Sequence, residues 1–113
     1  MIKGKYIYLG CNLYKFVNPH KFDLSEAVSL INVMTGEFAR HRDGIIIDSS
    51  YEADELFLYD SSFKFQVIDN SVTLFCTNPG MQMHYIADCN GVLRIVQGEQ
   101  FSNYLSLFPI LDK

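Results

Sequence analysis

The chain has 113 residues, of which 49% are hydrophobic and 19% are charged, and this balance excludes a disordered, charge-rich polypeptide. No apolar stretch approaches the roughly 20 residues that a membrane-spanning helix needs. The formal net charge of −4 argues against direct nucleic-acid binding, because nucleic-acid-binding surfaces present basic side chains to phosphates. Length and composition together predict one domain over residues 1–113 that binds neither nucleic acid nor a membrane.

Residues 5–9 and 13–17 are rich in β-branched and aromatic side chains and predict two short strands or one bent strand. Residues 24–35 then carry the clearest helical pattern. Asp23 and Glu26 resemble a capping box at its start, and Gly36 is a suitable residue at its end. The apolar side chains at helical spacing are Leu24, Ala27, Val28, Ile31 and Met34.

From Phe38 onward, short strand-like runs alternate with turn residues. The runs are residues 45–47, 56–59, 63–68, 72–77, 81–87 and 92–96. Asn90-Gly91 is the strongest turn signal, because a two-residue type I′ turn requires positive φ at both positions. Short turns join antiparallel neighbours, so these runs predict an antiparallel meander.

The end of the chain again shows helical spacing, at Phe101, Tyr104, Leu105 and Phe108, before Pro109. A short C-terminal helix is therefore expected. The predicted fold class is α+β, with the N-terminal helix packed on a curved antiparallel β-meander.

The cysteines Cys11, Cys76 and Cys89 are odd in number and widely spaced, unlike the dense, even set of a small secreted scaffold. We expect reduced thiols and a cytoplasmic protein. Cys76 and His84 flank one turn and could form a nucleophile and base. Period-two alternation places them on opposite faces of the sheet, which favours an inert thiol.

Neither the cysteines nor the histidines show a local metal-ligand spacing, so no metal or cofactor is expected. The residue pattern also lacks a catalytic signature, and we expect a non-enzymatic protein. The one local basic cluster, Arg40 to Arg42, is interpreted as a solvated turn.

The most informative feature is the charge pattern of residues 43–60. This segment contains six acidic side chains and neither Lys nor Arg, whereas residues 1–42 have a net charge of +3. Aromatic side chains between the acids supply anchors, and the acids attract a basic partner. The predicted partner-binding residues are Asp48, Tyr51, Glu52, Asp54, Glu55, Phe57, Tyr59 and Asp60. The alternative is a solvated loop and edge strand whose charges prevent aggregation.

These features favour a non-enzymatic acidic protein that neutralises a basic bacterial toxin, such as a nuclease, as immunity proteins and antitoxins do. A second hypothesis is a small-ligand-binding or enzymatic domain, with an apolar pocket and His84 or Asp88 as its polar group. A third is a structural protein that assembles into oligomers through its sheet edges.

Overall fold

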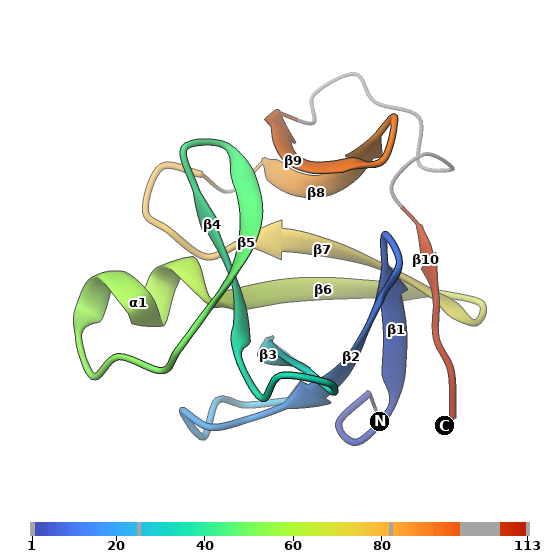
Figure 1. The fold of residues 1–113 in the computed structure, drawn as a ribbon, viewed down its shortest axis with the longest axis horizontal. Helices are drawn as coiled ribbons and strands as arrows, with labels where there is room; N and C mark the ends of the chain where they lie inside the picture. Colours follow the sequence, from blue (N-terminus) through green and yellow to red (C-terminus); the bar gives the residue numbers. More distant parts are fainter. Residues whose placement is uncertain (1, 25, 82, 98–106, 113) are drawn as a thin grey trace.

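The structure is a computed structural model that describes residues 2–24, 26–81, 83–97 and 107–112, and it is nearly all β-structure (Figure 1). The elements are β1 (Tyr6–Leu9), β2 (Asn12–Val17), β3 (Ala27–Asn32), β4 (Phe38–Arg42), β5 (Ile45–Ser49), α1 (Glu55–Asp60), β6 (Ser62–Ile68), β7 (Ser71–Cys76), β8 (His84–Cys89), β9 (Val92–Gln97) and β10 (Phe108–Pro109). The expected α+β class is therefore wrong, because strands make up 54% of the chain and helix 6%.

Seven of the strands close into an antiparallel barrel. Their order is β3-β4-β5-β9-β8-β7-β6, and β6 pairs back with β3. On the other edge of β3 the sheet continues through β2 to β1, and β10 pairs with β7. Tyr6 and Leu111 exchange two backbone hydrogen bonds of 2.8 and 2.7 Å, so the chain after β10 lies beside β1.

One face of every long strand contributes to a common apolar core. The register opposes Phe16 to Leu30 and Val28 to Phe63, and all four side chains are fully buried. The remaining buried members of this cluster are Ile2, Ile7, Leu9, Tyr14, Ala39, Val72, Leu74, Ile86 and Phe108. Burial of this apolar surface is the main driving force for closing the barrel.

Tight turns set the antiparallel connections. Asn90 and Gly91 have φ values of 56° and 87° between β8 and β9, which confirms the turn predicted from their sequence. Asp43 and Gly44 have φ values of 54° and 80° between β4 and β5. The left-handed backbone at these positions matches the twist of the strands on either side.

The helix expected over residues 24–35 is wrong, because residues 27–32 form β3. This strand is paired along both edges and is buried on both faces: Val28 and Leu30 enter the core, and Ala27 and Ser29 are buried on the opposite face. Burial on both faces removes the period-two alternation that identifies a strand. A continuous apolar run of this kind is difficult to distinguish from a helix by spacing alone.

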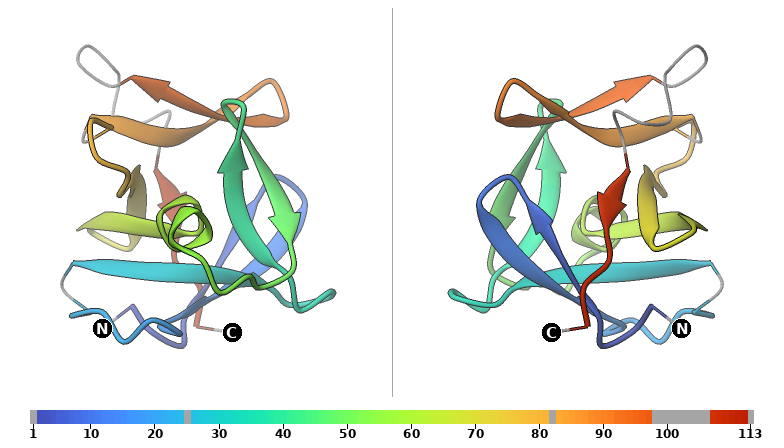
Figure 2. Two further views of the ribbon diagram at one scale, coloured as in Figure 1. Left: turned by 90° about the vertical axis from the view of Figure 1, so that its left-hand side faces the viewer. Right: turned by 90° about the vertical axis from the view of Figure 1, so that its right-hand side faces the viewer.

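Two further expectations also fail in part. The run at residues 56–59 was expected to be a strand, but it lies in α1, outside the barrel and above β3 in the left view of Figure 2. The C-terminal helix falls largely on residues 98–106, which lie outside the described residues. Its last expected member, Phe108, is in β10 and pairs with Val72.

The double-sided packing of β3 can be tested by truncating a core side chain. Leu30→Ala should lower the free energy of unfolding by about 2–5 kcal/mol, because it leaves a cavity in the barrel core. Met34→Ala, at the exposed β3–β4 turn, is the control and should change it by less than about 0.5 kcal/mol. Urea denaturation measures both values, and equal effects would contradict this packing.

Candidate functional site

A buried arginine determines how the acidic segment of residues 43–60 sits on the barrel. The Arg40 side chain is 2% exposed, and its Nη2 donates to Asp60 Oδ2 at 2.8 Å. Its Nη1 lies 3.7 Å from Glu52 Oε2, and its guanidinium stacks over the Phe57 ring at 5.1 Å. Arg40 thus connects β4 to both ends of the segment that contains α1.

A second layer of hydrogen bonds fixes Asp60. Asn78 Nδ2 donates to Asp60 Oδ1 at 3.0 Å, and His41 Nε2 lies 2.8 Å from Asn78 Oδ1. Thr77 Oγ1 donates to the carbonyl oxygens of Tyr59 and Ser62. The residues expected to form a solvated basic turn therefore lie in β4, where Arg40 and His41 are buried and only Arg42 is exposed.

Other acids of the segment also have structural contacts. Asp54 caps α1, since its Oδ1 accepts a hydrogen bond from the Phe57 amide at 2.7 Å. Asp48 accepts hydrogen bonds from Tyr14 Oη at 2.6 Å and from Asn32 Nδ2 at 2.8 Å. Burial and the neighbouring Asp48 carboxylate raise the pKa of the Tyr14 hydroxyl, so Tyr14 stays neutral and acts as a donor.

An aromatic cluster supports the connection that leads into α1. Phe57 is fully buried and meets Phe38 and Tyr51 edge-on, with ring centroids 5.8 and 5.4 Å apart. Tyr51 also stacks on His20 at 6.0 Å. Burial lowers the pKa of His20, which favours an uncharged ring in this cluster. Tyr51 is nevertheless 53% exposed, so one side of its ring faces solvent.

All six residues from 51 to 56 are exposed. We define the acidic patch as Tyr51, Glu52, Asp54, Glu55 and Leu56. Leu56, 58% exposed, was not predicted as a site residue, because only the helix geometry turns it outward while burying Phe57. The structure therefore brings five exposed side chains together, whereas Phe57 and Asp60 lie beneath them, Tyr59 is half-buried and Asp48 is bonded elsewhere.

Within the described part of the chain, Arg40 is the only Lys or Arg that lies within 4.0 Å of an acid of this segment. It offsets one of the six negative charges. The acidic patch therefore keeps a negative potential even though Asp60 is neutralised below it.

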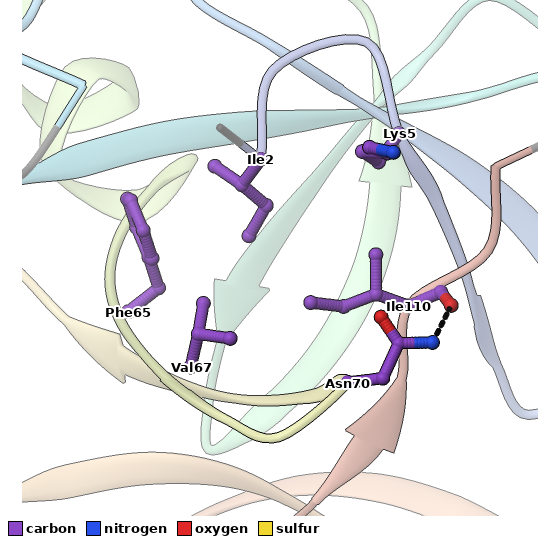
Figure 3. A pocket seen from close by; sticks show the side chains of 6 residues that line it. All are labelled: Ile2, Lys5, Phe65, Val67, Asn70 and Ile110. Atoms are coloured by element: carbon purple, nitrogen blue, oxygen red, sulfur yellow. Dashed lines mark hydrogen bonds between the residues drawn. The ribbon is translucent and has the colours of Figure 1, made fainter.

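The structure supports the expected ligand pocket less well than it supports the acidic patch. An open hollow of about 250 Å³ is lined by Ile2, Lys5, Phe65, Val67, Asn70 and Ile110 (Figure 3). Its polar groups already have partners, since Asn70 Nδ2 donates to the Ile110 carbonyl and Lys5 pairs with Asp112. The two groups expected to serve a ligand, His84 and Asp88, do not line this hollow.

The proposed nucleophile is also unsuited to catalysis. Phe75 pairs with Tyr85, so the adjacent Cys76 and His84 lie on the same face of the sheet, contrary to expectation. Burial and the charge of Asp60 nevertheless raise the pKa of the Cys76 thiol to about 12. Cys76 therefore remains a protonated core thiol at neutral pH.

Among the residues that the structure describes, no group of three or more His, Cys, Asp or Glu side chains is arranged to hold a metal ion. The same residues contain no helix with the length and apolar character needed to cross a membrane. No protein-family model matches the chain, and a search of curated protein sequences finds no significant match.

The importance of the buried ion pair can be measured from the stability of two variants. Asp60→Asn should lower the free energy of unfolding by about 3 kcal/mol, because it leaves the buried Arg40 cation without its carboxylate. Glu52→Gln is the matched control and should cost less than about 1 kcal/mol, because Glu52 is half-exposed and 3.7 Å away. Chemical denaturation gives both values, and a smaller loss for Asp60→Asn than for Glu52→Gln would refute the assignment.

Proposed function

We propose that the protein is a non-enzymatic inhibitor that binds a basic protein through the acidic patch. The observation that carries this proposal is the exposure of three carboxylates beside two exposed apolar side chains, Tyr51 and Leu56. Acids at an interface accelerate association and select the partner, whereas buried apolar anchors supply most of the affinity.

The contacts beneath the acidic patch favour its use as a binding surface. Arg40 and Phe57 hold α1 against β4, and the Asp54 cap fixes the first turn of the helix. A surface held in this way loses little conformational freedom when a partner binds. The patch is therefore preorganised, unlike a solvated loop that must be ordered during binding.

The chemistry of the patch also defines the class of partner. A nuclease binds a polyanion and therefore carries a basic active-site surface. The acidic patch is complementary to such a surface, and covering it would prevent access by the nucleic acid. A basic nuclease toxin is accordingly the partner class that we propose, and the protein would act as its immunity protein or antitoxin.

A selection with a random-peptide phage library tests the binding chemistry. The wild-type protein should enrich peptides rich in Lys and Arg, and Glu52→Lys/Glu55→Lys should weaken their binding by about tenfold or more. Asp54 is left intact in this variant because it caps α1. The control Glu26→Lys/Glu37→Lys makes the same change in net charge outside the patch, at the exposed Glu26 and the half-buried Glu37.

The two double variants separate the patch from the overall charge of the protein. The proposal expects the control to retain binding to the selected peptides, with binding measured by calorimetry and folding verified by circular dichroism. Equal losses in both variants, or selection of peptides without basic residues, would show that the acidic patch is not the binding site.

A further inference from the structure

The outer face of β1, β2 and β3 carries apolar side chains that are half-buried or exposed. We define the β1–β3 outer face as Tyr6, Tyr8, Leu13, Lys15, Ile31 and Val33. The register opposes Tyr8 to Leu13, Tyr6 to Lys15 and Lys15 to Ile31, so these five side chains share the face opposite the core. Val33 follows β3 directly, and its amide donates to the Leu13 carbonyl at 3.0 Å. Tyr8 and Val33 are 53% and 49% exposed. Monomeric proteins seldom expose a contiguous apolar face of this kind without a binding role.

A hollow of about 360 Å³ lies beside this face, lined by Tyr8, Leu13, Leu111 and Asp112. Lys15 lies over the Tyr6 ring at 5.8 Å. Lys3 and Lys5 immediately precede β1, and Asp112 pairs with Lys5. This end of the molecule therefore combines an apolar surface with an excess of positive charge.

The β1–β3 outer face is continuous with the acidic patch. Ile31 pairs with Phe38 in β4, and the Phe38 ring lies 5.9 Å from Tyr51. Figure 1 shows β1, β2 and β3 following one another toward the side of the molecule that carries α1. A single outer surface thus runs from lysines at one end, across apolar side chains, to carboxylates at the other.

Among the described residues, no lysine of the basic end lies within 4.0 Å of a carboxylate of the acidic patch. Lys15 and Phe38 are two strand spacings apart, or about 10 Å, and the acidic patch begins beyond Phe38. This separation is comparable to the distance over which physiological salt screens exposed charges, about 8 Å. Both ends therefore remain available to an external partner of opposite charge.

We propose that this surface forms a two-fold dimer with a second copy of the chain. A two-fold axis brings the basic end of each copy onto the acidic end of the other, so every contact occurs twice. Lys15 then faces Glu52 and Glu55 of the second copy, and Tyr51 and Leu56 pack near Tyr8, Leu13 and Val33. Charge complementarity supports the second copy as the occupant, because a surface with opposite ends is complementary to itself.

The dimer has a consequence for the proposed inhibitor, although its formation does not depend on a basic partner. It covers the acidic patch in both copies, so a basic partner must displace the second copy. Dimerisation therefore lowers the concentration of protein with an uncovered acidic patch. A basic partner must then bind more tightly to be inhibited at a given concentration.

Sedimentation equilibrium of charge-reversal variants tests the dimer directly. At low ionic strength, wild-type protein should show a concentration-dependent dimer that weakens as salt is added. Lys15→Glu alone and Glu52→Lys/Glu55→Lys alone should each weaken dimerisation by about tenfold or more, because each places like charges opposite each other twice.

An equimolar mixture of these two variants is the decisive measurement. Both charge contacts become attractive in the mixed dimer, so the mixture should regain wild-type association. A monomeric wild type at every concentration, or a mixture that stays monomeric while each variant is folded, would overturn the dimer. Lys15→Glu should still bind the selected basic peptides, because Lys15 lies outside the acidic patch. Loss of the dimer alone therefore leaves the proposed function intact, and loss of peptide binding alone leaves the dimer intact.

Discussion

The buried Arg40 guanidinium is the constraint on which the arrangement of the acidic segment depends. A cation removed from water must be paired, since an isolated buried charge is prohibitively unfavourable. Asp60 supplies that pairing from the end of α1, and Asn78 holds the second oxygen of the same carboxylate. The ion pair thus orients α1 on the outside of β4 and leaves residues 51–56 on the surface. Its role is to select one position for the helix, whereas most of the folding energy comes from the apolar core.

The position of α1 determines which acids of the segment remain exposed for binding. Asp60 is buried and pairs with Arg40, so it is not available to a partner. The exposed acids Glu52, Asp54 and Glu55 lie on the segment that this ion pair holds against β4. Lys15 in β2, with Lys3 and Lys5 just before β1, gives this surface a positive end beside the apolar side chains of β1–β3. The basic partner and the second copy that we propose would therefore both use this electrostatic pattern, and they would compete for the same carboxylates.

Some local features were predictable from the sequence, although the short helix α1 was not, and features that depend on tertiary contacts were missed. The Asn90-Gly91 turn was correct because its backbone requirement lies within two residues. The N-terminal helix was wrong because burial of β3 on both faces depends on the closed barrel. Charge counting found the acidic segment, but it could not show that Asp60 is buried against Arg40 or that Leu56 faces outward. The β1–β3 outer face was missed because it requires the register of three strands.

Amide hydrogen exchange of Asp60→Asn tests the central role of the ion pair most directly. If Arg40 and Asp60 hold α1 in place, the amides of Leu58 and Ser61, which bond to the Asp54 and Phe57 carbonyls, should lose protection selectively. The amides of the core strands β6 and β7 should keep most of their protection from exchange under conditions where the variant is folded. Unchanged protection of Leu58 and Ser61 would contradict the account, because the helix would then be held without the ion pair.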